Sequence, residues 1–144
     1  MNKIIVAIAC VFFIFGVLTA LGLQQATRRI GNVAAIKTVG VNVYEDASLT
    51  KPLTSIDWGT LEPGENKNVT AYIVNTSNVP VVLSLTTGNW NPTNTSIYVS
   101  LTWNYSGAPI PVGSYTPVVF TLHISPVTTG ITNFSFDITI VGAG

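Results

Sequence analysis

Residues 97–105 read Ile-Tyr-Val-Ser-Leu-Thr-Trp-Asn-Tyr, an uncharged run with a large apolar side chain at every second position. Successive side chains of a β-strand point to opposite faces, so this alternation predicts a strand with one buried face. The same pattern recurs in the segments 36–44, 118–124 and 134–140 and in shorter ones at 56–58, 69–73 and 81–85. The sequence therefore predicts about seven strands.

Turn residues separate these segments, as in Glu62-Pro63-Gly64-Glu65 and Asn75-Thr76-Ser77-Asn78. Beyond residue 31, no stretch carries apolar residues at helical spacing together with helix caps. Short strands at this spacing predict an all-β fold, an antiparallel β-sandwich of jelly-roll or immunoglobulin-like type. Among the aromatic residues, we expect Trp58 and Trp103 inside the core and Trp90 at the surface.

The chain begins with an uncharged apolar run, residues 4–23, preceded by Lys3. As a helix, twenty residues would span about 30 Å, the hydrocarbon thickness of a bilayer. The run predicts an N-terminal signal peptide or transmembrane anchor over residues 1–29, followed by a β-sandwich domain over 30–144. Cleavage sites before Leu23 or after Val33-Ala34-Ala35 and retention as an anchor all remain open.

Five Asn-x-Ser/Thr sequons follow residue 60, and together they favour an exported, glycosylated surface protein. The candidate acceptors are Asn68, Asn75, Asn94, Asn104 and Asn133. Only 8% of the 144 residues are charged, against the roughly 25% usual in soluble domains, so glycans would supply solubility that charge does not. We expect an extracellular or cell-surface location, with membrane contact through residues 4–23 if they are not removed.

Composition excludes several functions. Six basic residues, balanced by six acidic ones, give no basic face for nucleic acid. One His and one Cys leave no zinc site and no disulfide within a chain. His123 is expected on an outward strand face, and the scattered carboxylates match no calcium loop. We therefore predict no catalytic residue, no cofactor and no metal site: a protein that is not an enzyme.

The run Ile56-Asp57-Trp58-Gly59-Thr60-Leu61-Glu62-Pro63-Gly64-Glu65, continuing through KNVTAYIVNTSNVPVVLSLTTGNWNP, resembles small archaeal surface proteins related to bundling-pilus subunits. These are similar to the bacterial biofilm-matrix fibre protein TasA and to camelysins. Residues 35–44 and 130–137 extend the likeness, which covers residues 1 to about 142. Some camelysin-type relatives are labelled metalloproteases, but this chain has no HExxH motif.

The resemblance implies a jelly-roll-like subunit of an extracellular filament, serving adhesion or biofilm cohesion, in which the N-terminal strand of one subunit completes the sheet of its neighbour. Carried onto this chain, the donor segment is about residues 34–44, with Ile36, Val39, Val41 and Val43 as inserting side chains. Head-to-tail donation builds an open homopolymer, and the low charge permits lateral bundling.

Burial energetics are consistent with donation. Three inward valines contribute roughly 5–9 kcal/mol, against a whole-domain stability of about 5–15 kcal/mol, so a sandwich without this strand would be marginal. The connector, residues 45–53, permits the strand to fold back in its own chain or to enter a neighbour. The alternative function is a membrane-anchored monomeric surface domain for adhesion or glycan binding, with Tyr72, Trp90 and Tyr98 as candidate sugar-stacking aromatics.

Overall fold

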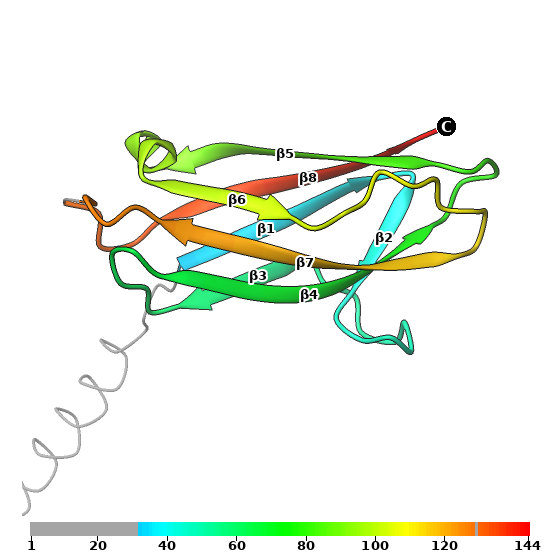
Figure 1. Cartoon of the computed structure of the whole chain (residues 1–144), viewed down its shortest axis with the longest axis horizontal. Helices are drawn as coiled ribbons and strands as arrows, with labels where there is room; N and C mark the ends of the chain where they lie inside the picture. Colours follow the sequence, from blue (N-terminus) through cyan, green and yellow to red (C-terminus); the bar gives the residue numbers. More distant parts are fainter. Residues whose placement is uncertain (1–31, 129) are drawn as a thin grey trace, which may run out of the picture. The chain divides into compact units, whose positions relative to one another are not determined.

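The computed structural model describes residues 32–128 and 130–144, so the apolar run 4–23, Cys10 and the predicted cleavage before Leu23 lie outside the described residues. The regular elements of the described part are almost all β-strands, as predicted (Figure 1). Its elements are β1 (Asn32–Val39), β2 (Val41–Tyr44), β3 (Ser55–Gly59), β4 (Asn66–Asn75), β5 (Val82–Asn91), the 3-10 helix η1 (Thr93–Ile97), β6 (Val99–Trp103), β7 (Tyr115–Ile124) and β8 (Ser135–Ala143).

The strands form two four-stranded sheets, with orders β3-β1-β8-β5 and β2-β4-β7-β6. Most neighbours are antiparallel, but β1 and β8 run parallel, with Ala34 opposite Phe136 and Val39 opposite Val141. The prediction of a purely antiparallel sandwich is therefore wrong at this pair. The first and last strands of the described chain are neighbours in one sheet and run in the same direction.

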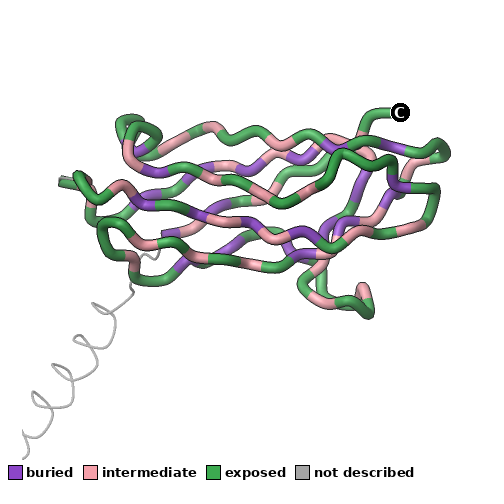
Figure 2. Tube along the Cα trace, in the orientation of Figure 1, coloured by how far each residue is buried: buried purple, intermediate pink, exposed green. Residues whose placement is uncertain are grey.

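The inner faces of the two sheets share one hydrophobic core, and the buried and exposed residues alternate along the strands (Figure 2). Trp58, on β3, is 2% exposed and lies in this core as predicted. Phe120 of β7 and Phe136 of β8 contribute the other large buried side chains. The alternation of apolar and polar residues thus identifies the buried face of the strands, because one face of each sheet packs on the core and the other faces solvent.

Most predicted strands have different ends in the structure, and two of them are interrupted. The strand expected over 36–44 is two strands in different sheets, divided at Gly40, whose φ is +72°. The strand expected over 97–105 is only β6, because Ile97 belongs to η1 and is 75% exposed. Both differences arise where backbone geometry interrupts an alternation that looks continuous in the sequence.

Candidate functional site

The candidate site is the segment formed by β1 and β2, residues 32–44, which we call the N-terminal segment. β1 lies inside its sheet, with β3 on one side and β8 on the other, and β1 is the only strand with which β3 pairs in that sheet. β2 is the edge strand of the second sheet, paired with β4. The segment therefore contributes to both layers.

Gly40 determines which side chains of this segment enter the core. Along β1, Ala34 is fully buried and Ile36 is half-buried, whereas Val39 is 59% exposed. After Gly40 the chain crosses to the other sheet, and the inward positions become Val41 and Val43. Of the four predicted inserting side chains, Val41 and Val43 are therefore in the core, Ile36 is at its margin, and Val39 lies on the outer surface.

Sequence periodicity could not place these four residues on one face of a strand, because Ile36 has an even number and the three valines have odd numbers. In one continuous strand, they would point to opposite faces. The corner at Gly40 resolves this by shifting the alternation by one residue. Gly40 also lies close to the last strand: a Cβ added there would be 3.0 Å from the carbonyl oxygen of Gly142. Only glycine adopts this backbone conformation at so close an approach without strain.

Asn32, which the sequence analysis did not single out, anchors the start of β1. Its side chain is 8% exposed, Nδ2 donates to the carbonyl oxygen of Gly59 at 2.9 Å, and Oδ1 accepts from the backbone N–H of Phe134 at 3.1 Å. One amide thus joins β1 to β3 and to the chain that leads into β8. No motif in the sequence marks such an asparagine, since its partners are 27 and 102 residues away.

On the outer face of the sheet, Lys37 Nζ of β1 lies 2.6 Å from Asp137 Oδ2 of β8. Asn89 Nδ2 donates to the same carboxylate oxygen at 2.6 Å. The hydrogen bond from Lys37, followed by the one from Asn89, holds the pKa of Asp137 below its ordinary value of 3.8. This cluster is the one ion pair within residues 32–128 and 130–144.

In the structure the connector runs over residues 45–54, one residue further than predicted, because β3 begins at Ser55. The Asp46 carboxylate holds it in place. It accepts from the Thr50 hydroxyl at 2.6 Å and from the backbone N–H of Lys51 at 2.9 Å, and these bonds lower the pKa of Asp46 below 3.8. Leu53 N–H donates to the carbonyl of Val43 at 2.8 Å. The connector therefore folds along the free side of β2, and beside it a cavity of ≈ 200 Å³ is lined in part by Ile36 and Leu53.

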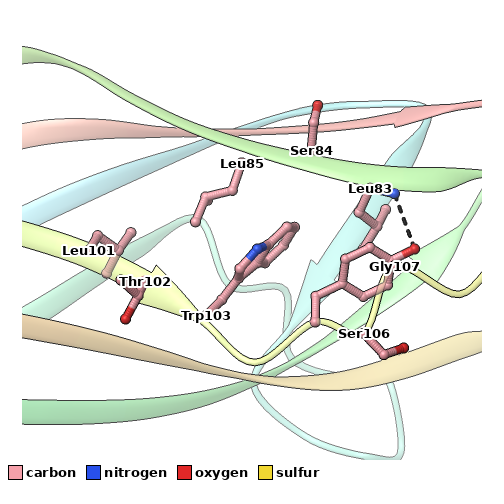
Figure 3. A pocket seen from close by; sticks show the side chains of 9 residues that line it. Leu83, Ser84, Leu85, Leu101, Thr102, Trp103, Ser106 and Gly107 are labelled. Atoms are coloured by element: carbon pink, nitrogen blue, oxygen red, sulfur yellow. Dashed lines mark hydrogen bonds between the residues drawn. The ribbon is translucent and has the colours of Figure 1, made fainter.

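The aromatic residues are arranged differently from two of the predictions. Trp103 is only half-buried and lines an open groove of ≈ 530 Å³ between β5 and β6 (Figure 3). Trp90 belongs to β5 rather than a turn and stacks on Phe136, with ring centroids 4.2 Å apart. Of the sugar-stacking candidates, Tyr72 also has an aromatic partner, the Tyr115 ring, with ring centroids 6.0 Å apart.

Four of the five sequon asparagines are exposed, namely Asn68, Asn94, Asn104 and Asn133. Asn75 is not: it is 1% exposed, Nδ2 donates to the carbonyls of Val79 and Ile110, and Oδ1 accepts from Ser77. In the folded chain this amide is inaccessible to a glycosyl donor, so Asn75 is withdrawn from the glycosylation candidates. Its tripeptide matches the acceptor motif because Ser77 is part of the turn that the amide stabilises.

His123 is exposed on β7, where Nδ1 lies 2.6 Å from Asn66 Oδ1. Across the described residues, no group of three His, Cys, Asp or Glu side chains could hold a metal ion. The same part of the chain contains no helix long and apolar enough to cross a bilayer. No protein-family model matches the sequence, and the search of curated proteins also found no match.

Proposed function

We propose that this chain is a structural subunit of an extracellular filament, in which the N-terminal segment of each subunit completes the sheets of a neighbour. One observation carries the proposal: the first strand of the described chain occupies the interior of a sheet. Without β1, β3 has no partner in that sheet and the edge of β8 is open. Exposed edges of this kind accept strands from other chains.

The geometry of the links supports donation of β1 and β2 together. Gly40 is the one residue between them, and such a link spans only about 7 Å, too little to reach across two separate domains. The connector 45–54 has ten residues and reaches about 33 Å when extended. A neighbour's sheets can therefore receive residues 32–44, provided that the connector unfolds from Asp46.

Burial by the segment is large enough to hold two subunits together. Val41 and Val43 together contribute roughly 3–6 kcal/mol, to which Ala34 and the margin residue Ile36 add. These residues and the Asn32 amide bonds would join subunits when the donor is a second molecule, and would stabilise one domain when it is the same molecule. The jelly-roll type, the extracellular location and membership of the bundling-pilus group rest on the resemblance at residues 35–44 and 56–65.

A cross-strand disulfide distinguishes donation from folding within one chain. Ala35 pairs with Ser55 across β1 and β3. The neighbouring residue Ile36 donates its N–H to the carbonyl of Thr54, so Ala35 and Ser55 form the closer, non-hydrogen-bonded type of pair. At about 4.5 Å between Cα atoms, a disulfide fits without distortion.

The experiment uses Ala35→Cys/Ser55→Cys with Cys10→Ser, in material sheared from the surface of expressing cells and oxidised. Donation predicts a ladder of covalent multimers on a non-reducing gel, collapsing to one band on reduction. The control pair Asn66→Cys/His123→Cys joins β4 and β7 of one chain in either arrangement and should give single copies. If Ala35→Cys/Ser55→Cys also gives only single copies, donation is wrong and the monomeric surface domain takes its place.

A further inference from the structure

The two open sides of the described domain are protected very differently. On one side lie the edge strands β2 and β3. The connector covers β2 through the Leu53–Val43 hydrogen bond and a bridge between Tyr44 and Pro52. At β3, the Lys67 ammonium donates to the carbonyls of Trp58 and Thr60 at 2.9 and 3.1 Å. Covering loops and charged groups are the devices that prevent strand pairing at sheet edges.

On the opposite side, formed by β5 and β6, a loop covers only the start of the β5 edge: Val81, the residue before β5, exchanges backbone hydrogen bonds with Ile110 at 3.1 and 2.8 Å. No charged residue and no proline occurs in 82–91 or 99–103. A second cap follows at Leu83: Tyr105 Oη accepts from Leu83 N–H at 3.3 Å and donates to the carbonyl of Ala108 at 2.6 Å. Beyond Leu83, the β5 edge has no such partner among the described residues.

The backbone N–H and C=O groups of successive strand residues point alternately to the two sides of the strand, so a few known hydrogen bonds show which groups of β5 and β6 are free. Because Leu83 N–H points away from β8, the groups of Leu85 and Thr87 on the same strand point away too. On β6, Asn104 N–H donates to Val119 O and Tyr98 O accepts from Ser125 N–H, so even-numbered residues face β7. The groups of Leu101 and Trp103 therefore face the open side.

The apolar floor between these edges matches the free backbone groups. Leu85, Leu101 and Trp103 are half-buried and line the ≈ 530 Å³ groove that Figure 3 shows between β5 and β6. An added strand would gain main-chain hydrogen bonds along the edge and would cover apolar surface at the same time. A free sheet edge with an apolar floor has the chemistry of a strand-pairing surface.

We propose that the β5 edge pairs antiparallel with the β5 edge of a second copy of this chain. The second copy is the occupant because the edge is uncharged, so two identical edges meet without repulsion. An antiparallel pair of identical strands is also two-fold symmetric, so a single surface suffices. With Thr86 at the centre, Leu85 of one copy exchanges hydrogen bonds with Thr87 of the other.

This contact goes beyond the proposed function and does not depend on it. β5 and β3 are the two opposite edges of one sheet, so the N-terminal segment and the β5 contact lie on different sides of β8. In a filament joined by donated segments, pairing of β5 edges would connect neighbouring filaments side by side. In single domains it would form dimers.

The test is a single cysteine at the symmetry centre. In a Cys10→Ser background, Thr86→Cys should form a disulfide between copies at least about tenfold faster than Asn66→Cys, an exposed position on β4. Adding Thr87→Lys, which places a charged side chain on the edge opposite Leu85 of the other copy, should return the rate to that of Asn66→Cys. Adding Ser84→Lys, whose side chain lies on the outer face, should change it by less than about threefold.

Equal rates for Thr86→Cys and Asn66→Cys would overturn the β5 contact, as would a Thr86→Cys rate that Thr87→Lys does not reduce. The Ala35→Cys/Ser55→Cys experiment reports on the other side of the sheet. A failure of strand donation with rapid Thr86→Cys pairing, or the reverse, therefore assigns the error to one proposal.

Discussion

Lys37 on β1 and Asp137 on β8 form an ion pair of 2.6 Å across the parallel strands, so the N-terminal segment carries one charge and its acceptor sheet the other. Lys37→Asp or Asp137→Lys alone places like charges together and should weaken the seating of β1. If β1 is donated between molecules, an equimolar mixture of the two variants restores an opposite-charge pair at every junction, because each variant's segment fits the other's sheet. We expect less filament from either variant alone than from the mixture.

Sedimentation at low ionic strength measures this recovery, since surface charge pairs are modest and screened by salt. The double variant Lys37→Asp/Asp137→Lys is the control and should polymerise alone. A mixture that polymerises no better than its components would show that both charges belong to one molecule.

Acid should destabilise the domain through Asp46 and Asp137, whose pKa values both lie below the ordinary 3.8. A carboxyl with a lowered native pKa contributes stability that is complete above its unfolded value and is lost as pH falls through the native value. The free energy of unfolding should therefore be flat above about pH 5 and fall below about pH 4. Urea unfolding across this range measures the fall.

Asp46→Asn/Asp137→Asn should reduce that fall, because neither side chain then binds a proton. Glu62→Gln is a suitable control, since its carboxylate makes none of these contacts. If the double variant loses stability in acid as steeply as the wild type, the dependence arises from other groups.

The strand pattern and the core were predictable from sequence because they depend on local alternation. Trp58 and the period-two faces of β7 and β8 follow from that rule alone. The parallel pairing of β1 with β8 was not predictable, because it joins residues about a hundred positions apart. The half-buried state of Trp103 follows from the open β5 and β6 edges, which are a property of sheet order.

The donor segment shows the same division. Val41 and Val43 lie in the core, whereas Val39, predicted with them as an inserting side chain, lies on the surface because a single glycine moves the chain between sheets. The amino-acid sequence around Gly40 does not distinguish a corner between two sheets from a position within one strand. The distinction comes from the carbonyl of Gly142, which approaches Gly40 too closely for a side chain.

Gly40→Ala should therefore destabilise the domain by about 1–3 kcal/mol, since the new Cβ meets Gly142 O at 3.0 Å in a left-handed conformation. Gly88→Ala is the matched control. Gly88 lies on β5, its φ is outside the left-handed region, and an added Cβ has no heavy atom within 4 Å. We expect a change of at most about 0.5 kcal/mol there, measured by urea unfolding. Equal effects at both glycines would mean that the Gly40 corner is not under the constraint described.

Asn75 provides a test of the glycosylation assignment and of the fold together. Its amide donates to Val79 O at 2.7 Å and to Ile110 O at 3.0 Å, and its Oδ1 accepts twice from Ser77, so Asn75→Ala removes four hydrogen bonds and should cost roughly 2–4 kcal/mol. The exposed sequon residue Asn94 has no comparable contacts, and Asn94→Ala should change stability by less than about 0.5 kcal/mol.

Intact mass of protein shed by the expressing cells gives the second readout. Where glycans are present, Asn94→Ala should remove the mass of one glycan if that site is occupied, whereas Asn75→Ala should remove none. A glycan mapped to Asn75 by peptide mass spectrometry would contradict the buried amide, because a modified Nδ2 cannot donate to both Val79 and Ile110. If no glycan is found at Asn75, the turn explains why its tripeptide matches the sequon. Ser77 donates its N–H and its hydroxyl to Asn75 Oδ1, at 2.8 and 2.7 Å, so the tripeptide has a structural role.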